Sequence, residues 1–355
     1  MQTIHVNLGE HAYNIEIGAG LLDSVGKKVA ALLPKAKHAV IVSDSNVAPL
    51  YSARLSKSLY EAGLPNTTIT FPAGEASKNL TTLGNVLEEI AAAGMTRTDV
   101  LLTLGGGVVG DLGGFAAASF MRGIAFVQVP TSLLAQIDSS VGGKVAVDLK
   151  AGKNLAGAFH QPKAVFIDTD LLNSLPVHFL HDGLAEAIKA GAILDRELFE
   201  FIAKLKDDAD LYANIEHVVA ECVKIKARVV EEDEFDTGIR MLLNFGHTLG
   251  HAIEQYYGYS HFTHGEGVAI GMYEITKRTE ALGITQAGCA EAIKNCLLKF
   301  NLPIDAGVDK SLLIETMAHD KKKNGSKISL VLLEEMGKAT YRKIDFAEIS
   351  TYYLE

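Results

Sequence analysis

The sequence has 355 residues, of which 48% are hydrophobic and 21% charged, and this composition excludes a disordered or fibrous chain. A chain of this length is too long for one ordinary hydrophobic core, so two domains are expected. The net charge of −10 argues against a nucleic-acid partner, although a local cluster of lysine and arginine could still bind an anionic small molecule.

Cysteine content and hydropathy bear on the compartment. The chain has an odd number of cysteines without CxxC spacing, namely Cys222, Cys289 and Cys296, so neither a disulfide framework nor a thiolate metal site is expected. A cytoplasmic location therefore fits best. The first residues alternate around a turn and show no signal peptide. No apolar run approaches the ~18 residues that span a bilayer, so no membrane partner is expected.

The first half of the chain alternates between expected strands and helices. Residues 2–8 and 12–18 are expected to form a β-hairpin that turns at Gly9–His11. The hydrophobic pattern then predicts helices over 21–33, 47–62 and 80–93, and strands over 38–44, 67–71, 100–104 and from Val165. This alternation predicts a parallel sheet with right-handed crossovers, and therefore an α/β domain.

Two loops that follow expected strands carry polar side chains. Ligands of parallel sheets bind at the carboxyl ends of the strands, which makes such loops candidate sites. Asp44 and Asn46 follow one strand, and Glu75 and Lys78 follow the next along the chain. Taken alone, each loop is better explained as an ordinary turn.

A glycine-rich segment follows the expected strand at 100–104. Gly105, Gly107 and Gly110 match G-x-G-x-x-G and precede a helix of small residues. Glycines let the backbone approach a pyrophosphate, and the helix N-terminus offers unpaired N–H groups, so this context favours a dinucleotide. The acidic residue usually found about 20 positions later is not evident, whereas Asp111 follows at once. A tight turn with close helix–sheet packing would explain the same glycines.

The Gly- and Ser-rich run 126–162 contains isolated polar residues. These residues are Asp138, Lys144, Lys153 and Asn154. The two lysines either bind a phosphate or are solvated loop residues. Pro176 then lies near the expected boundary between two domains, residues 1–177 and 178–355.

Helical patterns dominate the second half, and one segment there is dense in polar groups. His247 and His251 lie four residues apart, one helical turn, within the otherwise apolar segment Arg240–Glu254. Two imidazoles on one helix face are a common start to a zinc site, although an isolated pair is more often ordinary histidines. Clustered polar groups in an apolar segment indicate a site, because unpartnered buried polar groups cost stability.

A third ligand is available from elsewhere in the chain. Glu186 precedes Lys189 by three residues on an apolar helix, so an exposed ion pair is one explanation and a partly buried metal ligand with His247 and His264 is the other. The basic residues at 224–228 are either a solvated helix face or part of a site, and the tract His319–Gly325 is either a surface turn or an anion grip.

The chain resembles the 3-dehydroquinate synthases along nearly its whole length. The motifs that carry the resemblance are Gly105–Asp111, Ser119–Gly123, Pro130–Lys144, Gly152–Pro162, Gly183–Lys189, Arg240–Glu254 and His264–Met272. The resemblance implies an α/β N-terminal domain with a Rossmann-like parallel sheet that binds NAD, residues 1–177. It also implies a mainly α-helical domain for metal and substrate, residues 178–355, an active site between the two, and a homodimer.

The resemblance further implies the site residues. The metal, zinc or cobalt, would be held by Glu186, His247 and His264, which makes His251 an acid–base or orienting residue instead of a ligand. The residues implied for NAD are Asp44, Asn46, Glu75, Lys78, Gly106, Gly107, Gly110, Asp111, Thr131, Ser132, Lys144, Lys153 and Ser174. Those implied for the substrate are Arg122, Asp138, Lys144, Asn154, Lys189, Lys226, Arg240, Asn244 and Lys321, with Arg122 reaching in from the partner subunit.

The implied reaction converts 3-deoxy-D-arabino-heptulosonate 7-phosphate to 3-dehydroquinate by transient oxidation, phosphate elimination, re-reduction and aldol closure. Two departures are Asp236, where the family often has Glu, and Val145, where Thr is frequent. The alternatives are another sugar-phosphate cyclase and a metal-dependent polyol dehydrogenase. Retention of Arg122, Lys226, Asn244 and His251 favours dehydroquinate over the products of other cyclases, and a polyol dehydrogenase would not need the lysines and arginine for phosphate and carboxylate.

Overall fold

The computed structural model describes residues 1–321 and 327–354, with the side chains of residues 319–321 outside the description. Contacts divide the chain into two compact units. Unit 1 comprises Met1–Pro176 and Lys226–Phe235, and unit 2 comprises Val177–Ile225 and Asp236–Glu355. Helix α8 (Ile215–Glu232) therefore belongs to unit 2 up to Ile225 and to unit 1 from Lys226.

Unit 1 is built on a seven-stranded sheet in the described part of the chain, in the order β1-β2-β9-β6-β5-β3-β4. The strands are β1 (Gln2–Val6), β2 (Tyr13–Gly18), β3 (Ala39–Asp44), β4 (Asn66–Phe71), β5 (Val100–Gly105), β6 (Ala125–Pro130) and β9 (Ala164–Asp168). β1 and β2 pair antiparallel, as the expected hairpin does, and all other neighbours are parallel. The predicted parallel sheet is confirmed.

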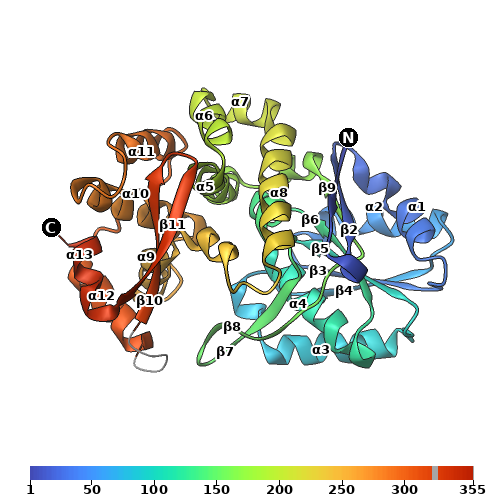
Figure 1. The fold of residues 1–355 in the computed structure, drawn as a ribbon. Helices are drawn as coiled ribbons and strands as arrows, with labels where there is room; N and C mark the ends of the chain where they lie inside the picture. The colour runs from blue at the N-terminus through green and yellow to red at the C-terminus, as the bar shows by residue number, and fades with distance from the viewer. Residues whose placement is uncertain (322–326, 355) are drawn as a thin grey trace. The chain divides into compact units, whose positions relative to one another are not determined.

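Helices cover both faces of this sheet (Figure 1). Alternate residues of a strand point to opposite faces, so Ile41 and Val42 of β3 enter two different cores. One core lies under α1 (Val25–Leu32) and α2 (Ala48–Glu61). The other lies under α3 (Leu80–Ala92), α4 (Gly107–Ser119) and the hairpin of β7 (Lys144–Leu149) with β8 (Gly152–Phe159).

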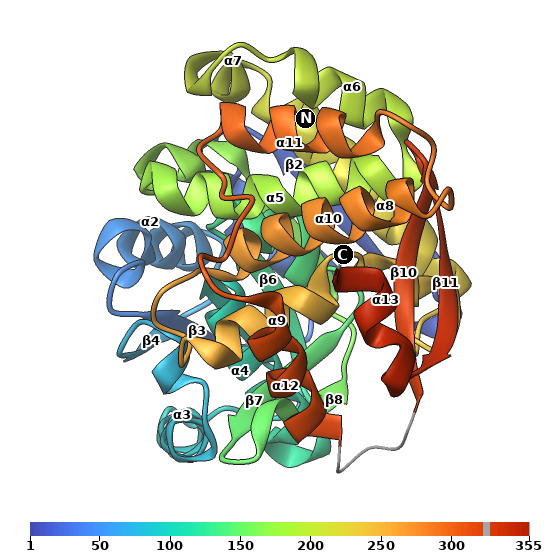
Figure 2. The same ribbon diagram turned by 90° about the vertical axis from the view of Figure 1, so that its left-hand side faces the viewer.

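Unit 2 consists of packed helices and one antiparallel hairpin, β10 (Lys327–Glu335) with β11 (Lys338–Asp345). The helices are α5 (Val177–Leu194), α6 (Arg196–Lys204), α7 (Asp208–Ala213), α9 (His247–Tyr256), α10 (His264–Ala281), α11 (Cys289–Lys299), α12 (Lys310–Lys321) and α13 (Ile349–Tyr353). Figure 2 shows α5, α10 and α11 side by side, and contacts join all three.

The helix pattern over Arg240–Glu254 is interrupted in the structure. Residues Ile239–Asn244 form a 3-10 turn, and α9 begins only at His247. Gly246 has φ +79°, and a Cβ there would lie 2.6 Å from the carbonyl oxygen of Val268. Because only glycine tolerates both conditions, the chain turns here and α9 packs against α10 backbone to backbone.

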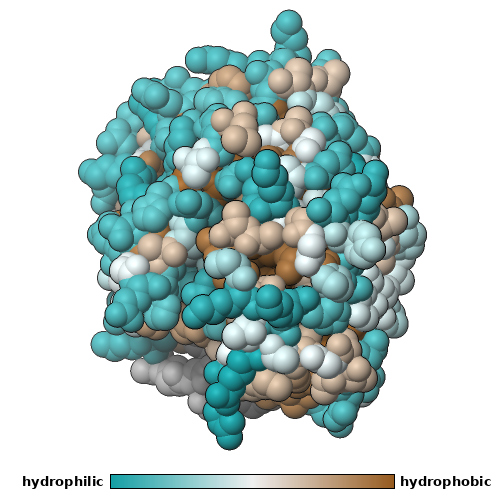
Figure 3. Space-filling model, turned by 90° about the vertical axis from the view of Figure 1, so that its right-hand side faces the viewer, coloured by the Kyte–Doolittle hydropathy of each residue, from teal (hydrophilic) through white to brown (hydrophobic). Residues whose placement is uncertain are grey.

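In the described residues, no helix combines the length and the apolarity needed to cross a membrane. The face of the molecule in Figure 3 is mainly hydrophilic, with hydrophobic residues in small areas between hydrophilic ones. Such a distribution is ordinary for a folded protein surface.

Candidate active site

Three side chains of unit 2 converge on one point. Glu186 comes from α5, His247 from the first residue of α9 and His264 from the first residue of α10. The Nε2 atom of His247 lies 3.6 Å from Oε1 of Glu186, and Nε2 of His264 lies 3.5 Å from the same oxygen. One potential ligand atom from each residue falls within 4.8 Å of the others.

The oxygen at the centre of this group, Oε1 of Glu186, has no hydrogen-bond partner among the described residues, although it is buried. An unpartnered buried carboxylate oxygen is costly and calls for an explanation such as an ion. One carboxylate and two imidazoles form a common ligand set of catalytic zinc, which leaves a further coordination position for substrate. The three residues therefore fit a divalent cation.

Charges around the group favour an ionised carboxylate and a neutral imidazole. Burial would raise the pKa of Glu186, but Lys189 and the two histidines hold it well below its ordinary value. The ammonium of Lys189 donates to Oε2 of Glu186, and both side chains are almost completely buried. Burial and the Lys189 charge hold the pKa of His247 well below its ordinary value. These are the protonation states that a metal requires.

His264 lies between two carboxylates. Its Nδ1 atom is 3.6 Å from Oε2 of Glu254, on the side of the ring away from Glu186. Burial lowers the pKa of His264, but the nearby carboxylates of Glu186 and Glu254 outweigh burial and raise the pKa to about 10. Between these two carboxylates the imidazole is therefore protonated at neutral pH when no cation is bound.

His251 lies beside this group and is exposed. Its ring centroid is 5.4 Å from that of His247 and 6.0 Å from that of His264. It also forms a second set of possible ligands with Glu254 and His264, but it is absent from the set around Glu186. An exposed imidazole next to a cation site can take up or release protons.

Helix α10 is anchored so that its first residue faces Glu186. The backbone N–H of Gly265 donates to Oδ1 of Asp182 at 2.6 Å, and Asp182 precedes Glu186 by one turn of α5. A capping box between Thr263 and Glu266 closes the same helix end. Asp182 was not among the residues predicted from the sequence, although its position four residues before Glu186 on α5 was a usable signal.

In unit 1 the candidate cofactor residues follow the carboxyl ends of parallel strands. Strand order reverses between β3 and β5, because β4 lies beyond β3 while β6 lies beyond β5. Such a switch point is where nucleotides bind in open α/β sheets. Asp44 ends β3, and the glycines from Gly105 end β5 and begin α4. Thr131 follows β6, and its N–H donates to the carbonyl of Gly105 at 3.0 Å.

Several of these residues also shape the loops. Asp44 accepts the backbone N–H groups of Asn46 at 2.8 Å and Val47 at 2.9 Å, which makes the turn into α2. A Cβ on Gly107 would approach Oγ of Ser139 to 3.2 Å, and a Cβ on Gly110 would lie 2.8 Å from Oε1 of Gln128. The glycines thus serve close packing as well as leaving a helix N-terminus bare.

A buried ion pair lies under the glycine-rich turn. Nζ of Lys78 is 2.5 Å from Oδ2 of Asp111, and Lys78 is 5% exposed. Burial raises the pKa of Asp111 to about 6 despite the lysine. Burial lowers the pKa of Lys78, but Asp111 and Glu75 outweigh it and raise the value. Glu75 also pairs with Lys153 at 3.6 Å, which joins the loop after β4 to strand β8.

Candidate substrate residues of unit 1 come together from distant parts of the sequence. Nζ of Lys226 lies 2.5 Å from Oδ1 of Asp138, which stands in a π-helical turn, Ala135–Ser139. π-turns are rare and are frequent at functional sites. Arg122 and Asn154 are non-glycine residues with φ of 69° and 55°. Such backbone strain also clusters at functional sites.

The remaining candidates occupy separate positions. Ser174 accepts a hydrogen bond from the Tyr51 hydroxyl at 2.5 Å, and Lys144 is exposed at the start of β7. Arg240 is buried in the 3-10 turn of unit 2, and Asn244 is exposed at its end. Of the residues not yet named, Gly106 lies before α4 and Ser132 lies after β6. Asp236 begins the second segment of unit 2. The side chain of Lys321 lies outside the described residues, as do residues 322–325 of the tract after it.

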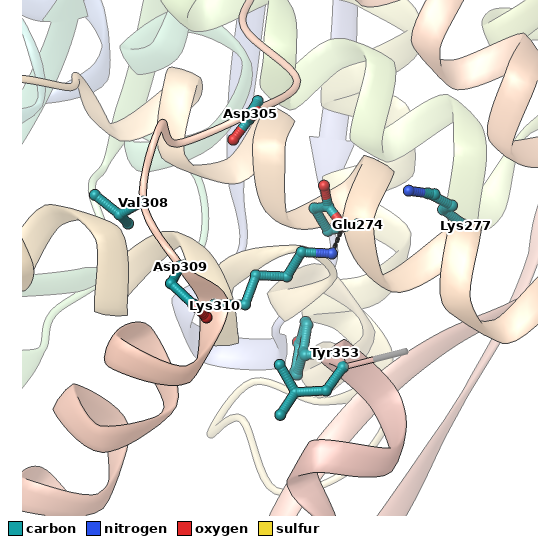
Figure 4. Close-up of a pocket in the computed structure, with 8 residues that line it drawn as sticks. Glu274, Lys277, Asp305, Val308, Asp309, Lys310 and Tyr353 are labelled. Atoms are coloured by element: carbon teal, nitrogen blue, oxygen red, sulfur yellow. Dashed lines mark hydrogen bonds and ion pairs between the residues drawn. The ribbon is translucent and has the colours of Figure 1, made fainter.

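A pocket of about 440 Å³ opens in unit 2 (Figure 4). Glu274 and Lys310 meet there at 2.5 Å, so α10 is tied to the start of α12. The pocket is further lined by Lys277, Asp305, Val308, Asp309, Tyr353 and Leu354. None of these lining residues belongs to the ligand sets described above.

Comparison with known proteins agrees with this geometry. The model for the 3-dehydroquinate synthase N-terminal domain matches residues 68–182, and the model for the C-terminal domain matches residues 183–323. The 3-dehydroquinate synthase of Clostridium acetobutylicum is 49% identical over 99% of both chains, and that of Clostridium beijerinckii is 48% identical over 97% of this chain and 98% of the relative.

A solved structure of 2-deoxy-scyllo-inosose synthase, complexed with carbaglucose-6-phosphate, NAD+ and Co2+, superposes with a TM-score of 0.88 at 26% identity over 99% of both chains. The matched domains, the near full-length relatives and the carboxylate–imidazole group lead to one conclusion: the chain belongs to the 3-dehydroquinate synthase family.

Proposed function

We propose that this chain converts 3-deoxy-D-arabino-heptulosonate 7-phosphate to 3-dehydroquinate and phosphate, with NAD regenerated in every turnover. The observation that carries the proposal is the group of Glu186, His247 and His264 in a chain 49% identical to a 3-dehydroquinate synthase. Identity to the inosose synthase is much lower, at 26%, which favours dehydroquinate over the product of another cyclase.

The domain roles follow from the two sets of residues. Residues 1–177 bind NAD, and residues 178–355 hold the metal and much of the substrate. Support comes from the bare helix N-terminus after Gly105 at the switch point of the sheet and from the unpartnered oxygen of Glu186. The residues proposed for the cofactor are Asp44, Asn46, Glu75, Lys78, Gly106, Gly107, Gly110, Asp111, Thr131, Ser132, Lys144, Lys153 and Ser174.

When bound, NAD would supply reversible hydride acceptance, and a divalent ion, zinc or cobalt, would supply polarisation of the reacting hydroxyl. Glu186, His247 and His264 would hold that ion. Lys189 keeps Glu186 ionised and, together with His251, serves the substrate hydroxyls and the proton movements. Exposure of His251 supports this role, because a general acid–base must exchange protons with solvent or substrate.

The other polar residues bind the two anionic ends of the substrate. Lys144, Asn154 and Arg122 bind the phosphate together with Lys321, and the strained backbone of Asn154 and Arg122 supports a functional role. Arg240 and Lys226 bind the carboxylate. Asp138, which already pairs with Lys226, binds a hydroxyl and keeps that lysine oriented. Asn244 binds the substrate beside them.

We also propose a cytoplasmic homodimer. The three cysteines are buried and none of them forms a disulfide, which fits a reducing compartment. Leu155 and Phe159 are exposed on one face of β8, at 59% and 46%, and Phe159 contacts the 60% exposed Phe235. Apolar side chains gathered in this way support a subunit contact, and the neighbouring Arg122 would then reach the partner's substrate.

One assay tests the activity against both rivals. The purified protein is given the heptulosonate phosphate with a substoichiometric amount of NAD, and phosphate and dehydroquinate are measured before and after chelation. We expect many products per NAD, no accumulation of NADH, and loss of activity that zinc or cobalt restores. Accumulation of NADH with glycerol and no phosphate release would instead identify a polyol dehydrogenase.

A further inference from the structure

Glu254 is a buried carboxylate beside the proposed metal ligands, and the reaction outlined above gives it no role. It is 4% exposed and lies on α9 seven residues after His247 and three after His251, so all three side chains share one helix face. A buried carboxylate is costly unless it is paired. Its ion-pair partner is Nδ1 of His264, at 3.6 Å.

The two ligand histidines are arranged alike. Nδ1 of His247 lies 3.1 Å from the backbone carbonyl of Phe245, and its Nε2 faces Oε1 of Glu186. His264 presents its Nδ1 to Glu254 and its Nε2 to the same oxygen of Glu186. In each ring a hydrogen-bond acceptor lies on the Nδ1 side. The Nε2 lone pair is therefore left for the point at which Glu186, His247 and His264 converge.

We propose that Glu254 is a positioning residue, whose carboxylate accepts the Nδ1 proton of His264 and so fixes the tautomer and ring orientation in which Nε2 binds the metal. A neutral imidazole carries one ring proton, and an acceptor at Nδ1 decides which nitrogen keeps it. The separation of 3.6 Å is that of an ion pair, with the Glu254 carboxylate on the Nδ1 side of the ring.

Glu254 together with His251 and His264 also satisfies the distance criterion for a cation of its own. A second ion there would require His264 to bind metal through both nitrogens and to lose both ring protons. An ordinary neutral imidazole between one ion and one carboxylate needs no such deprotonation, and this favours the positioning role.

The inference rests on the proposed function, and its test separates the two. Zinc affinity is measured by chelator competition, and the visible spectrum of the Co²⁺-loaded protein reports coordination geometry. Glu254→Ala should weaken zinc binding about 10- to 100-fold and alter the cobalt spectrum. Glu254→Gln keeps the shape and an acceptor oxygen but loses the charge, so it should lose less affinity and serves if the alanine variant does not fold.

Glu274→Gln is the matched control, because Glu274 is another buried and paired carboxylate, held by Lys310, that contributes to neither ligand set. It should lower the melting temperature and leave zinc affinity and the cobalt spectrum unchanged. Wild-type affinity and spectrum in both Glu254 variants, or two tightly bound ions per chain, would overturn the inference. If His264→Ala also bound zinc normally, the proposed metal site itself would fail.

Discussion

Removal of a single ligand tests the chemistry of Glu186 most simply. Glu186→Ala and His264→Ala should each reduce turnover at least about 10³-fold, because a bound ion supplies several kcal/mol of transition-state stabilisation. Metal content should fall in parallel, as measured by elemental analysis, while circular dichroism stays that of a folded protein. Glu200→Ala, which removes only surface pairs with Arg196 and Lys204, should retain activity. Wild-type turnover in either ligand variant would refute the assignment.

The pKa of Asp111 gives a pH-dependent prediction. Burial raises that pKa from 3.8 to about 6, so the folded chain binds this proton more tightly than the unfolded chain. The resulting contribution to stability is present in full below about pH 4 and is lost as pH rises through about 6. Asp111→Asn lacks it, so the unfolding free energy of D111N relative to wild type should rise by up to roughly 3 kcal/mol between pH 4 and pH 7.

Urea unfolding of both proteins across this pH range, without NAD, checks the prediction. The loss of the Lys78 ion pair lowers the stability of the variant, and in wild type Lys78 stays protonated across this range because Asp111 and Glu75 raise its pKa. A stability difference between D111N and wild type that does not change with pH would contradict the prediction.

Residue chemistry alone predicted part of the site. Glu186, His247 and His264 could be selected because carboxylates and imidazoles in apolar segments need partners, although the resemblance was needed to set His251 aside. Glu254 and Asp182 were not selected, because their roles depend on which ring atom or backbone N–H faces them in space. The pair of Asp138 with Lys226 joins residues 88 positions apart, and no local pattern indicates such a contact.

At the scale of elements, glycine contacts bring the ligand helices together. A Cβ on Gly271 of α10 would lie 2.0 Å from the carbonyl oxygen of Gly246, just before α9. Gly271→Ala should therefore push α10 from α9, lower the unfolding free energy by about 1–3 kcal/mol or more, and weaken metal binding. Denaturant unfolding and metal titration measure the two effects.

Gly84 provides the matched control for this substitution. It lies in α3, and a Cβ there would meet no atom within 4 Å. Gly84→Ala should stabilise the protein by roughly 0.5–1 kcal/mol, because alanine favours the helix, and should leave metal binding unchanged. Equal effects of the two substitutions would show that helix propensity, and not close packing, governs Gly271.

The alternation of hydrophobic segments with polar loops predicted the bounds of β1 to β5 to within two residues and the start of β9 to within one, but it did not predict β6. It did not predict the break at Gly246, where close packing against α10 overrides the helical pattern. Nor did it predict the π-turn Ala135–Ser139 or the β7–β8 hairpin. Both segments are rich in small residues, which are also common in loops. Only their packing against α4 distinguishes them from loops.

At the scale of the whole molecule, the sequence boundary near Pro176 is close to a boundary between the two units, but Lys226–Phe235 returns to unit 1. A single boundary in the sequence cannot describe a segment of the second half that packs with the first unit. The consequence of this return is that Lys226, from the second half of the sequence, pairs with Asp138 of the first.

The proposed dimer is tested through Phe235, which lies in this returning segment. Phe159→Glu combined with Phe235→Glu should convert a dimer to a monomer in sedimentation experiments, because two charges replace exposed apolar rings. Activity should fall with it if Arg122 serves the partner's substrate. Leu50→Glu, at a 55% exposed apolar position on α2, is the control and should leave the dimer intact. A dimer in the double variant would place the contact elsewhere.

The most direct measurement of the central claim is X-ray absorption spectroscopy of the Co²⁺- or Zn²⁺-loaded protein. We predict one ion per chain with two imidazole nitrogens and one carboxylate oxygen at about 2.0–2.2 Å, and loss of one imidazole in His264→Ala. A first shell without imidazole, or one that is unchanged in His264→Ala, would contradict the account.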